Sequence, residues 1–319
     1  MVFPVGAACH TLTGHTPHIA HMALVRWFSR TGGWANDLIS ALLSLLHGPY
    51  RIPEASGLLP AIGRSELDAV QASMARDGYC ILPQKLPADF CDRIARAMEG
   101  KDFAIRDDSV PWQPERLIKY DRNAPVAHNY MLPNDDITDI PEVQDLVSDP
   151  VLINVAQNYL KAVSIFSGMS LYYSAAVKDE PDMESAQAFH WDLERIRWIR
   201  FFIYLNDVDE NNGPHCFIRG THRTGGIPRE LLSRGYVRYT DDEVIAMCGK
   251  ENYREFHATK GTILAEDSRG LHKGKVLKRG ERVMLAFELS NSTFGASKRH
   301  RIRNIHVPRF GEYARKYPR

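Results

Sequence analysis

The sequence is poor in cysteine, and it lacks long apolar runs and an excess of charge of either sign. Its five cysteines are odd in number, widely spaced and without a Cys-x-x-Cys pair, which argues against a disulfide framework and a zinc ribbon. No apolar run is long enough to span a membrane, and the first thirty residues lack the apolar core of a cleavable signal peptide. With 40 basic and 39 acidic residues, the composition indicates no nucleic-acid partner. These absences favour a cytoplasmic globular protein without a transmembrane segment.

The chain divides into three regions. Residues 1–64 are predicted to form an N-terminal arm with a short amphipathic helix, and residues 65–297 the main domain. An insert at 225–259 within this domain is expected to hold two helices. Residues 298–319 form a basic tail, which we assign to a solvated end in preference to an anionic binding segment.

The N-terminal arm contains two patterns that each allow more than one interpretation. Histidines 15, 18 and 21 recur every three residues, but Pro17 interrupts a helix there and no acidic residue is near. We therefore predict a mobile or partly ordered arm over 1–35 in preference to a metal patch. Asn36 or Asp37 is then expected to cap a short helix, whose apolar stripe can touch a membrane surface. We favour packing of this stripe against its own domain or a sister subunit, which would give a homo-oligomer through the helix. The stripe consists of Leu38, Ile39, Leu42, Leu43, Leu45 and Leu46.

From residue 65 onward, helices come first and short strands follow. Ser65 and Asp68 have the spacing of a capping box for a helix over 66–77, which Gly78 ends. A strand is predicted over 79–83, and residues 101–140 have an irregular pattern. Further helices are predicted over 87–98, 141–148 and 150–161, and strands over 169–178, 196–206, 214–218, 261–266, 270–272 and 282–290. This order predicts an α+β, β-rich fold, in which a double-stranded β-helix (a jelly-roll or cupin-like core) is backed by N-terminal helices.

Three of these strands alternate in the same way. Within 169–178, 197–206 and 282–290 the odd positions are apolar apart from Arg197, whereas the even positions include hydroxyls, aromatics and arginine. Successive side chains of a strand point to opposite faces, so one face should pack on helices while the other meets water or a cavity. Aromatic residues on the even face, such as Phe202, favour a lined cavity.

A candidate metal site begins at His190-Trp191-Asp192. Residues i and i+2 of an extended chain project to one side, so His190 and Asp192 can bind one ion together. The motif alone is weak, because about one or two such pairs are expected by chance in a chain with 13 histidines and 39 acidic residues. His272 is the candidate third ligand, since two histidines and one carboxylate form the facial triad of non-haem Fe(II) oxygenases. Arg282, first on the even face of the last strand, can bind the distal carboxylate of an acidic cosubstrate.

The order of these motifs resembles the phytanoyl-CoA dioxygenase family of Fe(II)/2-oxoglutarate oxygenases. The resemblance covers roughly residues 65–292 and includes Asn-Gly-Pro at 212–214 and Gly-Thr-His at 220–222. It implies that His190, Asp192 and His272 bind iron, and that Arg282 binds the 5-carboxylate of 2-oxoglutarate. His222 is expected to be a hydrogen-bonded second-shell or turn residue and not a ligand.

The resemblance also implies looser assignments in the cosubstrate pocket. Tyr172, Ser174 and Tyr204 stand where the family places cosubstrate and substrate contacts. Some relatives carry a hydroxyl residue two positions after the distal histidine, where this chain has Gly274. We therefore expect Ser174 or Arg200 to make that contact instead.

The activity implied by the resemblance is hydroxylation of a small molecule with O2 and 2-oxoglutarate, releasing succinate and CO2. Asp192 favours hydroxylation over halogenation, because related halogenases have Ala or Gly at this position. Arg195, Arg197 and Arg200 hint at an anionic, sugar-derived or CoA-linked substrate, against the alternative of ion pairing with neighbouring acids. The loop at 179–184 and the insert at 225–259 are candidate lids.

Two other classes of function remain open. A non-catalytic cupin-like metal- or ligand-binding module would take up metal without forming succinate. A peripheral interaction protein would bind vesicles or a partner through the leucine stripe and the basic tail.

Overall fold

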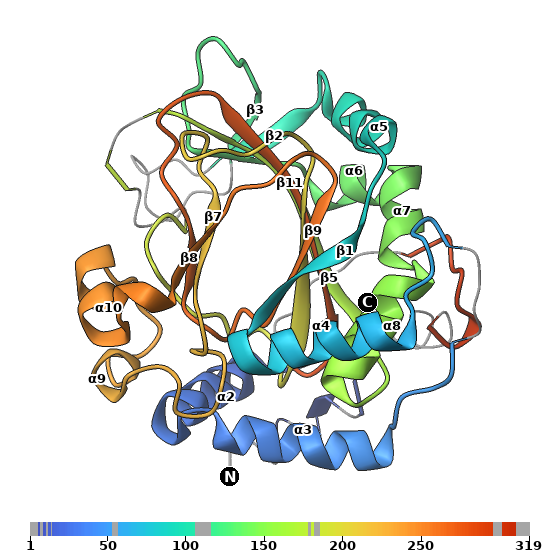
Figure 1. Cartoon of the computed structure of the whole chain (residues 1–319), viewed down its shortest axis with the longest axis vertical. Helices are drawn as coiled ribbons and strands as arrows, with labels where there is room; N and C mark the ends of the chain where they lie inside the picture. The colour runs from blue at the N-terminus through green and yellow to red at the C-terminus, as the bar shows by residue number, and fades with distance from the viewer. Residues whose placement is uncertain are drawn as a thin grey trace.

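The computed structural model describes residues 6, 9–10, 12–13, 15–52, 57–105, 116–177, 180–181, 186–295 and 302–310. At its centre two β-sheets face one another, with helices on the outer sides (Figure 1). None of the helices in these residues is long and apolar enough to cross a bilayer.

Most helices precede residue 161 and most of the long strands follow it, although the first four strands are interleaved with the helices. The helices are α2 (His18–Thr31), α3 (Trp34–Leu46), α4 (Arg64–Asp77), α5 (Ala88–Met98), α6 (Asn134–Thr138), α7 (Pro141–Val147), α8 (Pro150–Leu160), α9 (Arg229–Leu232) and α10 (Asp241–Cys248). The strands are β1 (Tyr79–Lys85), β2 (Asp102–Ile105), β3 (Arg116–Lys119), β4 (Asn129–Met131), β5 (Ile165–Ala175), β6 (Trp198–Tyr204), β7 (His215–Ile218), β8 (Tyr253–Phe256), β9 (Thr262–Glu266), β10 (His272–Gly274) and β11 (Glu281–Ser290).

The strands form one large and one small antiparallel sheet. The large sheet has the order β1-β9-β6-β11-β5-β4-β2-β3, and the small sheet has the order β10-β7-β8. The central pair β5 and β11 runs from Ala175 opposite Glu281 to Ile165 opposite Ser290, with one register shift after Glu288. Two facing antiparallel sheets backed by helices confirm the predicted double-stranded β-helix core.

The alternation seen in the sequence sorts residues to the two faces of the large sheet, as predicted. Odd residues such as Leu171, Phe201 and Phe287 are buried in the main core together with apolar residues of α4, α5, α7 and α8. Even residues such as Phe202 and Met284 form a separate cluster with Phe217 and Phe256 of the small sheet. The even face therefore lines the space between the sheets.

Local chemistry explains where α4 begins and ends. Glu66 accepts a hydrogen bond from the Gly63 backbone N–H at 2.9 Å. The helix therefore begins about two residues before the start predicted from the capping box at Ser65. Gly78 ends it in the left-handed conformation with φ 92°, which a residue without a Cβ adopts at low cost. The predicted helices over 87–98, 141–148 and 150–161 correspond to α5, α7 and α8.

Three predictions about the N-terminal region need correction. The segment expected to be a mobile arm forms α2, which begins directly after Pro17, because proline is compatible with the start of a helix. The helix α3 begins at Trp34, so Asn36 lies inside it and is buried. Of the predicted apolar stripe, only Ile39 and Leu43 pack partly against the domain. Packing on the chain's own domain is therefore wrong for the four other leucines, Leu38, Leu42, Leu45 and Leu46, which are exposed.

Three other regions also differ from expectation. Residues 101–140 contain β2, β3, β4 and α6, whose short lengths give little periodicity to detect. The insert at 225–259 holds α9 and α10 but also β8, which pairs with β7; its sequence Tyr-Arg-Glu-Phe has no simple apolar alternation. In the tail, Val307 and Phe310 are buried in the main core, so this part is not a solvated end.

Candidate metal centre and cosubstrate pocket

His190 and His272 lie side by side because their backbones form an antiparallel bridge. The His190 N–H donates to the His272 carbonyl at 3.0 Å, and the His272 N–H donates to the His190 carbonyl at 2.9 Å. Residues paired in this way stand directly opposite one another, and the two imidazole centroids are 4.3 Å apart. Asp192 is held two residues further on, where its N–H donates to the Ser268 carbonyl at 2.9 Å. The structure thus brings together the three residues predicted as metal ligands.

The donor atoms of these residues face a common point. His190 Nε2 is 3.9 Å from Asp192 Oδ1, and His272 Nε2 is 3.5 Å from Asp192 Oδ2. One ligand atom from each residue lies within 4.8 Å of the others, and within the described ranges this is the one such group of three. Each imidazole Nδ1 lies at hydrogen-bond distance from a backbone carbonyl, that of Ala188 at 3.0 Å or Gly270 at 2.9 Å. A proton on Nδ1 leaves the Nε2 lone pair free, so two neutral imidazoles and one carboxylate fit a ferrous ion.

The charges around this cluster keep Asp192 ionised. Burial alone would raise the pKa of Asp192, but Arg200 and the two histidines hold that pKa well below its usual value. Burial, reinforced by His272, places the pKa of His190 well below its usual value. Burial also lowers the pKa of His272, yet the hydrogen bond and charge of Asp192 outweigh it and the net shift is upward. A metal ion therefore competes with a proton for the His272 imidazole.

The predicted cosubstrate arginine lies in the same space between the sheets. Arg282 is buried and stands opposite Ser174, and its Nη2 donates to Ser174 Oγ at 3.1 Å. Its Nη1 donates to the Gly213 carbonyl, whereas its buried Nε has no hydrogen-bond partner among the described residues. An unsatisfied guanidinium N–H in a buried position is suited to a carboxylate. The residues present thus fit 2-oxoglutarate.

Gly274 connects the arginine with the metal cluster. A Cβ built at Gly274 would lie 3.0 Å from Arg282 Nη2, so the missing side chain leaves room for the guanidinium. Gly274 is two residues after His272 on β10, and such a step spans about 7 Å on one face of a strand. A five-carbon dicarboxylate can bridge that distance. Some relatives have a hydroxyl residue at the position of Gly274. In this chain the glycine avoids a close contact between such a side chain and the Arg282 guanidinium.

The comparisons with known proteins agree with this geometry. The sequence profile of the family described as Phytanoyl-CoA dioxygenase (PhyH) matches residues 74–275, which is more than half of the chain. The chain belongs to the phytanoyl-CoA dioxygenase family. It is accordingly an Fe(II)- and 2-oxoglutarate-dependent oxygenase.

Similar solved structures share the fold at low sequence identity. The epimerase SnoN, solved with Fe3+, alpha ketoglutarate and nogalamycin RO, is 14% identical with a TM-score of 0.51, and the alignment covers 71% of this chain and 84% of SnoN. EctD from S. alaskensis, in its apoform, is 18% identical with a TM-score of 0.50, and the alignment covers 78% of this chain and 88% of EctD. No curated protein matches the chain.

In this family member Arg200 contacts the candidate ligand Asp192. Its Nη1 donates to Asp192 Oδ2 at 2.7 Å, its Nε donates to Glu288 at 3.0 Å, and its Nη2 reaches Glu288 and Glu194. Glu288 lies six residues along β11 from Arg282, which corresponds to about 20 Å. The sequence analysis expected Arg200 to contact the cosubstrate near Arg282. The geometry separates Arg200 from that end of the pocket.

The two predicted tyrosines have their hydroxyls directed at protein groups. Tyr204 donates to the Phe256 carbonyl at 3.0 Å and accepts from the His215 N–H at 3.0 Å, so it joins β6 to the small sheet. Tyr172 donates to Met284 Sδ at 3.1 Å. Both rings belong to the cluster between the sheets, where they shape the cavity.

Sequence reasoning missed a second layer of residues around the metal cluster. His215 Nε2 is 2.8 Å from Glu266, whose other carboxylate oxygen is 4.0 Å from His272 Nδ1. Tyr236, in the insert, donates to Asp192 Oδ1 at 3.1 Å. Glu266 and Glu288 both lie at even positions of their strands, and this pattern could have placed them on the face between the sheets. Nothing in the sequence indicated the contact of Tyr236 with Asp192.

The Gly-Thr-His motif supports the strand that carries His272. Thr221 Oγ1 accepts from the Leu271 N–H at 2.8 Å and donates to the Ile218 carbonyl at 2.7 Å. His222 is buried in the turn after β7, outside the metal cluster, and burial lowers its pKa to about 4. The expectation of a turn residue that is not part of the cluster is consistent with this position.

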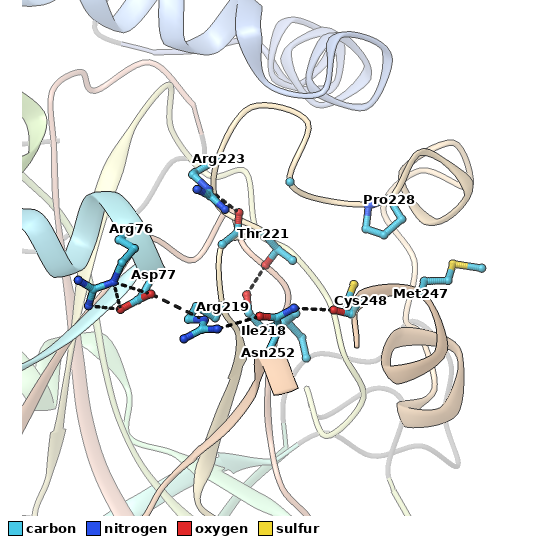
Figure 2. A pocket seen from close by; sticks show the side chains of 12 residues that line it. Arg76, Asp77, Ile218, Arg219, Thr221, Arg223, Pro228, Met247, Cys248 and Asn252 are labelled. Carbon is cyan, nitrogen blue, oxygen red and sulfur yellow. Dashed lines mark hydrogen bonds and ion pairs between the residues drawn. The ribbon is translucent and has the colours of Figure 1, made fainter. Parts of the chain in front are cut away.

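A separate cavity of about 490 Å³ lies at the end of β7, lined by residues of α4, β7 and the insert (Figure 2). None of the predicted site residues lines it. Its arginines make contacts within the protein: Arg76 pairs with Asp77 at 2.6 Å, and Arg219 donates to Asn252 at 3.3 Å. This cavity is therefore distinct from the space between the sheets.

Proposed function

We propose that this oxygenase hydroxylates a small anionic metabolite, with His190, Asp192 and His272 as the Fe(II) ligands and Arg282 as the residue that binds the 5-carboxylate of 2-oxoglutarate. The observation that carries this proposal is the convergence of two imidazole Nε2 atoms and one carboxylate within 4.8 Å in a buried position. The unsatisfied Arg282 Nε supports the second assignment.

When bound, Fe(II) and 2-oxoglutarate supply the oxidation by O2, with release of succinate and CO2. The chain's own residues position these groups and exclude water. Ser174 orients Arg282, and its hydroxyl in turn donates to Asn129 at 2.7 Å. We assign Arg200 to positioning Asp192, because its guanidinium donates to three carboxylates. Tyr172 and Tyr204 are assigned to the wall of the pocket.

The charge near the metal cluster supports an anionic substrate. Arg195 and Arg200, which suggested such a substrate in the sequence, are buried in contacts with the protein. Arg238 of the insert is different: it is half-buried, lies 5.6 Å from the Tyr236 ring and, within the described chain, forms no ion pair. Its positive charge also contributes to the low pKa of His190, so it acts on the metal cluster. We therefore propose Arg238 as a contact for an anionic substrate group.

The insert at 225–259 is the lid that we propose, because Tyr236 and Arg238 place it over Asp192 and His190. Most of the other predicted lid, 179–184, lies outside the described residues. We keep 1–64, 65–297 and 298–319 as proposed regions of the chain. The five cysteines are free thiols, which supports a cytoplasmic location.

The test is anaerobic addition of Fe(II) and 2-oxoglutarate, followed by admission of O2 and measurement of succinate. We expect the weak visible charge-transfer band of the chelate in the wild type and its loss in His190→Ala and His272→Ala. His257→Ala is the matched control, because this histidine is exposed and outside the cluster. Absence of the band in the wild type would contradict the ligand assignment. A band without succinate formation would indicate the non-catalytic metal-binding alternative.

A further inference from the structure

The helix α3 is amphipathic, but its polar face is turned toward the protein and its apolar face toward solvent. Its polar residues Asn36 and Ser40 point into the protein, where Ser40 accepts a hydrogen bond from Asn291 at 2.8 Å. Its large apolar residues point outward on a single face, because positions 34, 38, 42 and 45 are spaced by three or four residues. They are Trp34 (54% exposed), Leu38 (54%), Leu42 (52%), Leu45 (83%) and Leu46 (74%). A contiguous apolar face of this kind marks an interaction surface.

The charges beside this face are positive. The helix α2 packs against α3, and the two form the outermost layer at the bottom of the view in Figure 1. Arg26 and Arg30 are exposed on α2, as is Ile19, and Arg51 is exposed five residues after the end of α3. Asp37 is the one acidic residue between 15 and 52, and it is already bound by Arg269 at 2.8 Å and by Thr224 at 2.6 Å. Within residues 15–52 the surface is therefore apolar and cationic, and its one carboxylate is already bound.

We propose that α2 and α3 form a surface that binds an anionic phospholipid bilayer, with α3 lying in the plane of the membrane interface. Tryptophan and leucine on one face with arginine beside them are the features of an interfacial helix. A second copy of the chain fits less well. A two-fold interface places the same patch against itself, which would bring arginines together without carboxylates to pair with them.

The surface is anchored to the candidate metal centre. His21 of α2 lies with Nε2 2.8 Å from the Leu193 carbonyl, and Phe28 packs on Trp191 with ring centroids 5.0 Å apart. Trp191 stands between the candidate ligands His190 and Asp192. A bilayer bound at α3 would therefore hold the enzyme in a fixed orientation, and this proposal does not depend on the identity of the substrate.

The test is cosedimentation of the full-length protein with vesicles of phosphatidylcholine alone and of phosphatidylcholine mixed with phosphatidylglycerol. We expect binding to the anionic vesicles and its loss in Leu42→Gln/Leu45→Gln. Arg26→Gln and Arg30→Gln should each weaken binding about fivefold. The matched control is Leu117→Gln/Val126→Gln, which removes two exposed apolar side chains elsewhere and should bind as the wild type does.

Succinate formation and circular dichroism of the Leu42→Gln/Leu45→Gln variant should match the wild type, because neither side chain is buried or near the metal cluster. The proposal would be overturned if the wild-type protein did not bind anionic vesicles. Equal binding by the wild type and this double variant would also overturn it. A dimer that the same two substitutions convert into a monomer, without vesicle binding, would assign the face to a second copy instead.

Discussion

Arg200 connects the candidate metal ligand Asp192 with Glu288, so removing its charge should change both stability and metal binding. The side chains of Arg200 and Glu288 are only 13% and 4% exposed. Truncating one member of a buried ion pair leaves the other uncompensated, which costs about 3–5 kcal/mol. We expect Arg200→Met to lower the free energy of unfolding by about this amount. It should also lower Fe(II) affinity about 10- to 100-fold, because Asp192 loses the partner that orients it.

A double variant separates the two effects. Adding Glu288→Gln to Arg200→Met removes one of the three carboxylates that Arg200 contacts, so part of the lost stability should return. Asp192 still lacks its partner, so Fe(II) affinity should stay low. Urea unfolding measures the first quantity and anaerobic Fe(II) titration measures the second. Wild-type metal affinity in the double variant would refute the positioning role of Arg200, and a fully stable single variant would refute the estimate for the buried pair.

Three further predictions concern the cosubstrate and the pH. Arg282→Ala should lower anaerobic 2-oxoglutarate affinity about 10- to 100-fold, because hydrogen bonds to a charged group are worth about 1.5–3 kcal/mol, with Fe(II) affinity unchanged; an equal loss of both affinities would point to unfolding of the pocket instead. Gly274→Ala should weaken 2-oxoglutarate binding roughly tenfold in the same titration, since the added methyl lies 3.0 Å from the Arg282 guanidinium and overpacking costs about 1–3 kcal/mol. Asp267 is buried, and although burial alone raises its pKa, Arg269 lowers it to about 2, below the ordinary 3.8. Its carboxylate therefore stabilises the fold above pH 4, and this contribution, on the order of 2 kcal/mol, is lost as the pH falls toward 2. In urea unfolding from pH 5 to pH 2.5, Asp267→Asn should lose about that much less stability than the wild type, and equal losses would contradict the assignment.

The strand faces and two of the three candidate metal ligands were predictable because each depends on short-range spacing. Alternation placed Phe201 on the helix side and Phe202 between the sheets, since a strand repeats every two residues. The His-x-Asp spacing placed two candidate ligands, His190 and Asp192, together for the same reason. His272 could be proposed only from the order of motifs, because its proximity depends on a bridge between segments eighty residues apart.

The contacts that the sequence did not reveal depend on tertiary structure. Arg200 has the same parity as the pocket residues, but its partners Asp192 and Glu288 come from separate segments. The insert's Tyr236 reaches Asp192 from a turn without periodicity. In α3 the apolar pattern was correct, but its direction was not, because the buried Ser40 and Asn291 form a polar contact that periodicity does not indicate.

The reciprocal main-chain bonds between His190 and His272 have a consequence for substitution at residue 192. The backbone bonds pair the two candidate histidine ligands directly, whereas the carboxylate of Asp192 is oriented by the side chains of Arg200 and Tyr236. A single exchange at residue 192 would therefore remove the candidate carboxylate ligand without disturbing the main-chain pairing of the two histidines.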